Sequence, residues 1–91
     1  MFNKLKQFRD LRQHAKLMQN ALATESVIVE KGGITVVMNG NMELTKITLN
    51  ENIGKDSQEG LLAEAINEAI KKTQQIMARK MQEMGGFPGL M

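Results

Sequence analysis

A long amphipathic segment, residues 56–84, limits what this chain can fold into more than any other feature. A helix of about 28 residues is a rod of roughly 40 Å. Its apolar side consists of Leu62, Ala63, Ile66, Ala69, Ile70, Ile76, Met77, Met81 and Met84. Short strands cannot cover a rod of this length. Its distal half, from about residue 73, must therefore project, pack against another helix or meet another subunit.

A second helix is predicted over residues 3–22. Its apolar residues recur every three or four positions and so share one stripe: Leu5, Phe8, Leu11, Ala15, Met18 and Leu22. The basic residues of the same segment fall mostly off that stripe. They are expected to face water.

The middle of the chain changes to the alternation and β-branched content of strands. Strands are predicted over residues 27–29, 34–38 and 42–49. Gly32-Gly33 suits a tight turn between the first two. Asn39-Gly40 predicts a second hairpin, with a type I′ turn that needs positive φ at both central residues. The three strands form an antiparallel meander.

The third strand carries an irregular pattern. Met42 and Leu44 share one face, whereas Ile47 and Leu49 share the other. A β-bulge near Thr45-Lys46 would bring the two pairs to one side, because a bulge adds one residue to a strand.

The predicted fold is α+β, in the order helix, three-stranded antiparallel meander, long helix. Residues 1–84 form a single two-layer domain, and residues 85–91 form a flexible Gly/Pro tail. Asp56 and Glu59 are predicted to form a capping pair at the start of the long helix.

The core composition favours a homodimer. Aromatic residues are only 3% of the 91 residues, and no cysteine is present to cross-link the chain. A small domain with a core of aliphatic residues and eight methionines often shares that core with a second copy. The predicted dimer interface consists of Ile66, Ile70, Met77 and Met81. The methionines could instead form an adaptable surface for another protein.

Charge is distributed unevenly along the chain. Residues 1–22 hold five basic residues and one acidic residue, a net charge of +4, and residues 23–53 have a net charge of −2. Residues 71–80 contain four basic residues and no acidic one. This segregation suggests an oriented polyanionic partner. Ordinary solvated helix faces are the alternative.

The sequence offers little for catalysis, so we predict that the protein is not an enzyme. His14 is the only histidine and is expected to be solvated, and Ser26 and Ser57 resemble turn or cap residues. Glu64 and Glu68 could hold a cation, but Lys71 and Lys72 lie one turn on and form a surface ladder with them. Phosphate-binding glycine motifs are absent. We expect no cofactor, metal or small-molecule substrate.

Membrane insertion and export are not expected either. Residues 34–38 are the most apolar segment, far short of the about 20 residues that span a bilayer. No apolar stretch of signal-peptide length follows Lys4 and Lys6. A cytoplasmic protein is predicted.

The segment from Gly33 to Leu49 is the most telling part of the chain: a glycine turn, a Val-rich strand, an Asn-Gly turn, and a strand ending in Ile47-Thr48-Leu49. Together with the opening Met1-Phe2 and the closing Phe87-Pro88-Gly89-Leu90, it resembles the bacterial YbaB/EbfC family. The resemblance covers almost the whole chain. It implies a tight, intertwined homodimer with projecting helical arms, which associates with the nucleoid and binds DNA.

The leading hypothesis is therefore a homodimer that binds double-stranded DNA, in an architectural or gene-regulatory role. Charge placement predicts phosphate contacts from Lys4, Lys6, Arg9, Arg12 and Lys16 on the first helix and from Lys71, Lys72, Arg79 and Lys80 on the second. A dimeric adaptor that binds proteins through Met-rich arms is the alternative. A membrane-surface binder that uses the basic first helix is a third possibility.

Overall fold

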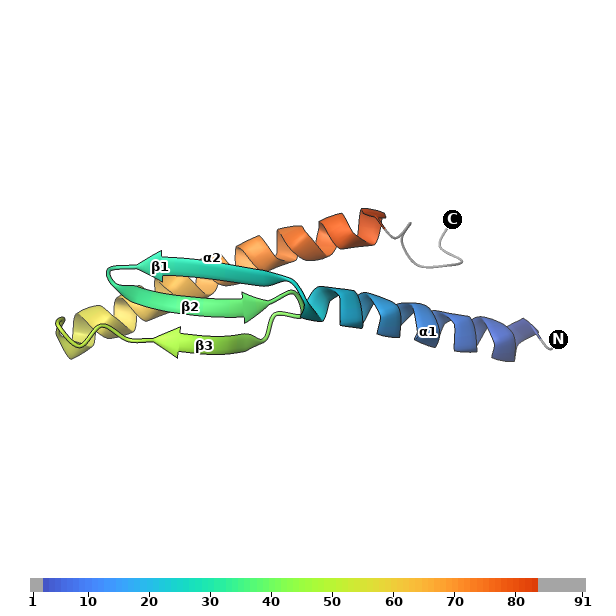
Figure 1. Cartoon of the computed structure of the whole chain (residues 1–91), viewed down its shortest axis with the longest axis horizontal. Helices are drawn as coiled ribbons and strands as arrows, with labels where there is room; N and C mark the ends of the chain where they lie inside the picture. The colour runs from blue at the N-terminus through green and yellow to red at the C-terminus, as the bar shows by residue number, and fades with distance from the viewer. Residues whose placement is uncertain (1–2, 84–91) are drawn as a thin grey trace.

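Two helices and a three-stranded sheet follow one another in the predicted order (Figure 1). The computed structural model describes residues 3–83, with side chains from residue 6 onward. The elements are α1 (Asn3–Ala23), β1 (Ser26–Lys31), β2 (Ile34–Asn39), β3 (Leu44–Thr48) and α2 (Lys55–Glu83). The α+β prediction is confirmed. The predicted tail and Met84 lie outside the described residues.

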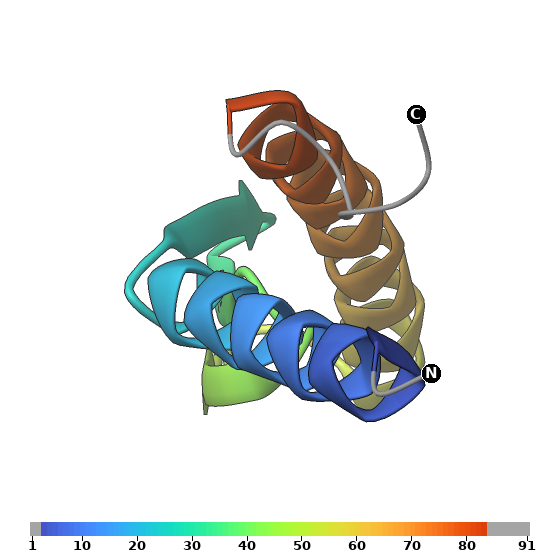
Figure 2. The same ribbon diagram turned by 90° about the vertical axis from the view of Figure 1, so that its right-hand side faces the viewer.

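The sheet is an antiparallel meander in the order β1-β2-β3, and α2 covers one of its faces (Figure 2). Side chains alternate along β2, so that Ile34, Val36 and Met38 are buried against α2. On α2, the small residues Ala65 and Ala69 are fully buried, which lets the helix approach the sheet closely. The hydrophobic core of the described residues lies between these two layers.

The two hairpins use their glycines differently. Gly32 and Gly33 both have positive φ, +56° and +86°, as expected for a tight two-residue turn. The predicted type I′ turn at Asn39-Gly40 is wrong, because Gly40 does not have positive φ and the connection is longer. Met42 takes the left-handed conformation instead, with φ 62°.

The predicted bulge is present. Val37 pairs with Lys46, but Met38 pairs with Leu44, so Thr45 is the extra residue on β3. Because Val36 pairs with Ile47 and both Val36 and Met38 face α2, Leu44 and Ile47 point toward the same side of the sheet.

The start of α2 differs from the predicted capping pair. The helix begins at Lys55, and the Gly54 carbonyl accepts a hydrogen bond from the backbone N–H of Gln58 at 2.9 Å. Asp56 thus lies inside the first turn rather than at the cap. Its negative charge still suits the positive end of the helix dipole.

The last turn of α1 is fastened to the β2–β3 turn. The backbone N–H of Gly40 donates to the Leu22 carbonyl at 3.0 Å, and Asn41 Nδ2 donates to the Gln19 carbonyl at 3.0 Å. The Leu22 carbonyl is one of the last four of α1, which have no partner within the helix, and it also accepts a hydrogen bond from the Glu25 N–H at 3.0 Å. From this attachment α1 extends beyond the sheet along the long axis, which measures 63 Å (Figure 1).

We predict that Gly40→Ala lowers the free energy of unfolding by about 1–3 kcal/mol, the usual range for overpacking. An added Cβ would contact the Leu22 carbonyl oxygen, and backbone atoms cannot easily give way. Urea denaturation followed by circular dichroism measures the change. Gly60→Ala is the matched control, because a Cβ there meets nothing within 4 Å and α2 should gain about 0.5–1 kcal/mol. Equal stability of the two variants would contradict the proposed role of Gly40.

Candidate nucleic-acid interface

The projecting helix α1 carries an exposed row of basic side chains. Lys6, Arg9, Arg12 and Lys16 are all exposed, as the sequence predicted, whereas the side chain of Lys4 lies outside the described part. Among the described residues, none of these four cations holds an ion pair. Their charges are thus available to an external anion.

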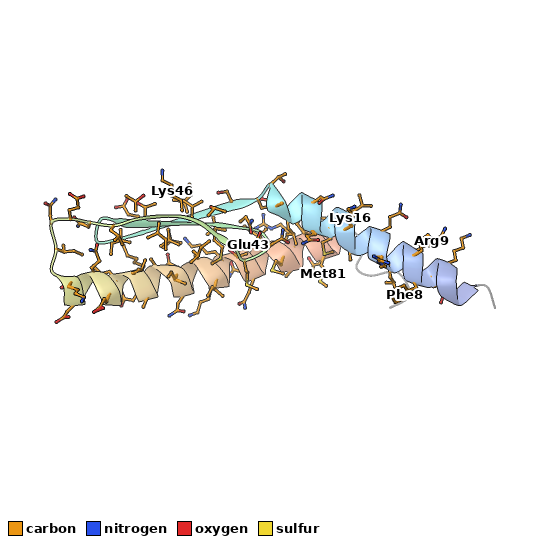
Figure 3. All side chains as sticks on the ribbon, turned by 90° about the horizontal axis from the view of Figure 1, so that it is seen from below. Phe8, Arg9, Lys16, Glu43, Lys46 and Met81 are labelled. Carbon is orange, nitrogen blue, oxygen red and sulfur yellow. The ribbon has the colours of Figure 1, made fainter. Side chains whose placement is uncertain are left out.

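Three of these cations share a shallow hollow on the flank of α1. The hollow has a volume of about 430 Å³ and is lined by Phe8, Arg9, Arg12, Gln13 and Lys16. Lys16 lies on the side of the molecule away from α2, as does Lys46 of β3, whereas Phe8 points toward the side on which α2 lies (Figure 3). The aromatic ring therefore marks the boundary between the basic and the apolar face of α1.

The basic residues of α2 are less available. Lys71, Lys72 and Arg79 are exposed, but Lys72 Nζ lies 3.6 Å from Glu68 Oε2. Lys80 Nζ is 3.2 Å from Glu25 Oε1 and 3.7 Å from Glu83 Oε1. The hydrogen bond to Glu25 raises the pKa of Lys80, and the nearby Glu83 adds to the effect. Two of the four predicted cations on α2 thus already have carboxylate partners.

The predicted Glu64/Glu68 ladder is present only at Glu68. This carboxylate pairs with Lys72 and, across the two layers, with Lys31 Nζ at 3.1 Å. The hydrogen bond from Lys31 lowers the pKa of Glu68, against a smaller effect of burial that raises it. No sequence pattern indicates Lys31 as a partner of Glu68, because only the packing of β1 on α2 brings Lys31 to the helix.

An apolar surface remains uncovered beside the basic arm. On the α2 side of β3, Leu44 and Ile47 are 42% and 41% exposed, because α2 packs mainly over β1 and β2. On α1, the outer half of the apolar stripe is exposed at Phe8 and Leu11, whereas Met18 is buried. Within one chain, Phe8 keeps 63% and Leu11 39% of its side-chain surface exposed.

The four predicted interface residues of α2 lie along one flank of that helix. Ile66 and Ile70 are half-buried against the core of their own chain. Met77 is also half-buried, and Met81 is exposed. The first two therefore contribute to the protomer core, and the methionines extend the flank toward the end of the helix.

His14 is the one histidine available for catalysis or metal binding. His14 is half-buried rather than solvated, which corrects the prediction from the sequence. Among residues 3–83 no group of three or more potential metal ligands is present. In the same range, neither helix is long and apolar enough to cross a membrane.

Comparison with known proteins gives one consistent result. The family model described as the YbaB/EbfC DNA-binding family matches residues 1–87. A nucleoid-associated protein of Chloroflexus aurantiacus is 41% identical, over 87% of this chain and 85% of the relative. One from Mycoplasmopsis pulmonis is 38% identical, over 75% of this chain and 72% of the relative. One from Syntrophobacter fumaroxidans is 28% identical, over 98% of this chain and 89% of the relative.

Proposed function

The chain belongs to the YbaB/EbfC DNA-binding family, and we propose that it acts in the nucleoid as a homodimer that binds duplex DNA through its basic helical arms. Relatives named as nucleoid-associated proteins support the nucleoid role. In this proposal the protein organises or regulates DNA and catalyses no reaction.

The observation that carries the proposal is the exposed row of unpaired cations on α1. Phosphate binding by Lys and Arg releases counterions from DNA and supplies most of the affinity that does not depend on sequence. Duplex DNA is favoured over single strands, because single-strand sites usually stack bases on aromatic side chains. Within residues 3–83 the only aromatic side chain is Phe8, and it lies on α1 rather than on the sheet.

The proposed contact residues divide into two groups. The α1 group of Lys4, Lys6, Arg9, Arg12 and Lys16 makes the main contribution. The α2 group of Lys71, Lys72, Arg79 and Lys80 contributes less, because Lys72 and Lys80 must leave their carboxylate partners to reach a phosphate. Exposed ion pairs are weak, about 0–1 kcal/mol, so this exchange is possible but brings little gain.

The uncovered apolar surface supports the homodimer. Five apolar side chains on three elements are exposed in one chain: Leu44 and Ile47 on β3, Met81 on α2, and Phe8 and Leu11 on α1. Monomeric soluble proteins rarely leave contiguous apolar surface of this kind open to water. A second copy that covers it would leave two basic arms projecting from one centre.

We predict that affinity for an arbitrary duplex falls steeply with salt. If about six phosphates are neutralised, log K against log salt has a slope near −5. Replacing Arg9 and Arg12 together by Ala should weaken binding to unrelated duplexes by similar factors and make the slope shallower by about two. Gel shifts over a range of salt concentrations measure both quantities.

The matched control replaces Lys72 and Lys80 together by Ala, which removes the same charge from α2. We expect this variant to change the slope less than the α1 double variant does. If the two variants behaved alike, the ranking of the helices would be wrong. If the unmodified protein bound no duplex even at low salt, the DNA proposal would fail and the adaptor hypothesis would be preferred.

We also predict that the protein sediments as a dimer at micromolar concentration, at twice the chain mass of 10.2 kDa. Ile47→Glu should shift the equilibrium strongly toward monomer, because it places a charge within the proposed interface. Ile28→Glu is the control, since Ile28 is 66% exposed on the opposite face of the sheet and the dimer should persist. A wild-type monomer in sedimentation equilibrium would overturn the homodimer.

A further inference from the structure

We infer that α1 enters the major groove of the duplex and that Arg12 and Gln13 contact base edges there, so that this helix reads sequence as well as binding phosphates. The inference rests on the proposed binding of duplex DNA. It assigns a role in sequence specificity to Gln13. The contact residues predicted from charge do not include Gln13, because its side chain is neutral.

The first argument is the arrangement of donors on α1. Arg9, Arg12, Gln13 and Lys16 stand at positions i, i+3, i+4 and i+7, which an α-helix places on one face. The same spacing is used by helices that read bases in the major groove. All four side chains line or flank one hollow, and all four are exposed.

The second argument is that nothing competes for these donors. Within the described residues, no hydrogen bond or ion pair occupies Arg9, Arg12, Gln13 or Lys16. Asp10, the only acidic residue of α1, lies at the edge of this face, three residues before Gln13, and it holds no ion pair among the described residues. On α2, by contrast, Glu68 and Glu83 hold Lys72 and Lys80.

The third argument is access. A major groove about 12 Å wide admits one α-helix, provided that nothing else lies against the side that enters. Among the side chains of residues 6–23, only Met18 and Leu22, in the last turns of α1, are buried. The apolar stripe faces the α2 side, and Lys16 faces away from it (Figure 3). The donor face is therefore the side of the arm that can enter a groove.

The chemistry of the four donors divides their roles. An amide such as Gln13 can form two hydrogen bonds with adenine N6 and N7, and the guanidinium of Arg12 can donate two to guanine O6 and N7. Arg9 and Lys16 lie about 10 Å apart along the axis, seven residues at 1.5 Å each, and contact phosphates at the groove edges. Phosphate contacts position the helix, and base contacts specify the sequence.

The experiment selects preferred duplexes from a randomised pool with the full chain and then compares variants on a selected and an unrelated duplex. Gln13→Ala should lose at least about fivefold of the discrimination between the two, while its salt slope stays unchanged, because no charge is removed. Arg12→Lys keeps the charge but loses the two-pronged guanidinium, and it should behave similarly. Gln7→Ala is the matched control, since Gln7 is exposed on the opposite side of α1.

Methylation of guanine N7 by dimethyl sulfate gives a second readout, because N7 lies in the major groove. Protection of guanines in the selected duplex by the wild-type protein is the expected result. Unprotected guanines, or Gln13→Ala and Arg12→Lys variants with wild-type discrimination, would overturn the groove-reading role. In either case salt-dependent binding to both duplexes would leave the proposed function standing. Loss of all duplex binding by the wild type would instead remove the proposed function itself.

Discussion

The hydrogen bond from the Gly40 N–H to the Leu22 carbonyl is the constraint on which the functional geometry depends. It joins the last turn of α1 to the β2–β3 turn, and Asn41 reinforces it through the Gln19 carbonyl. The burial of Met18 and Leu22 adds to this attachment. With it, α1 is held out from the body, and its basic face stays open to solvent. A residue with any side chain at position 40 would meet the Leu22 carbonyl.

A second constraint is the mismatch between α2 and the sheet. The helix packs across β1 and β2 on the small side chains Ala65 and Ala69, so close contact there leaves the inner face of β3 uncovered. The bulge at Thr45 keeps Leu44 and Ile47 on that inner face. One protomer therefore ends with an apolar edge beside a basic arm. In the proposed dimer, the second copy covers the apolar edge, and the basic arm binds DNA.

The basic residues of the two helices differ in how many of them form ion pairs. On α2, two of the basic residues have acidic partners: the Lys72–Glu68 pair lies within the helix, and the Lys80–Glu25 pair joins the helix to the α1–β1 junction. On α1, the cations of the donor face have no such partners in the described chain. The paired basic residues of α2 thus have a mainly structural role, whereas the basic residues of the α1 donor face remain available for ligand binding.

Periodicity alone determined the element order, the bulge and the exposure of the α1 cations, because these follow from local spacing and the turn propensity of glycine. Other features depended on residues distant in sequence. Gly40 is required by the approach of α1 rather than by its own φ, and Lys31 reaches Glu68 only through the packing of β1 on α2. The Lys72–Glu68 pair follows from its spacing within α2, but the Lys80–Glu25 pair depends on the tertiary structure, because it joins residues far apart in the sequence.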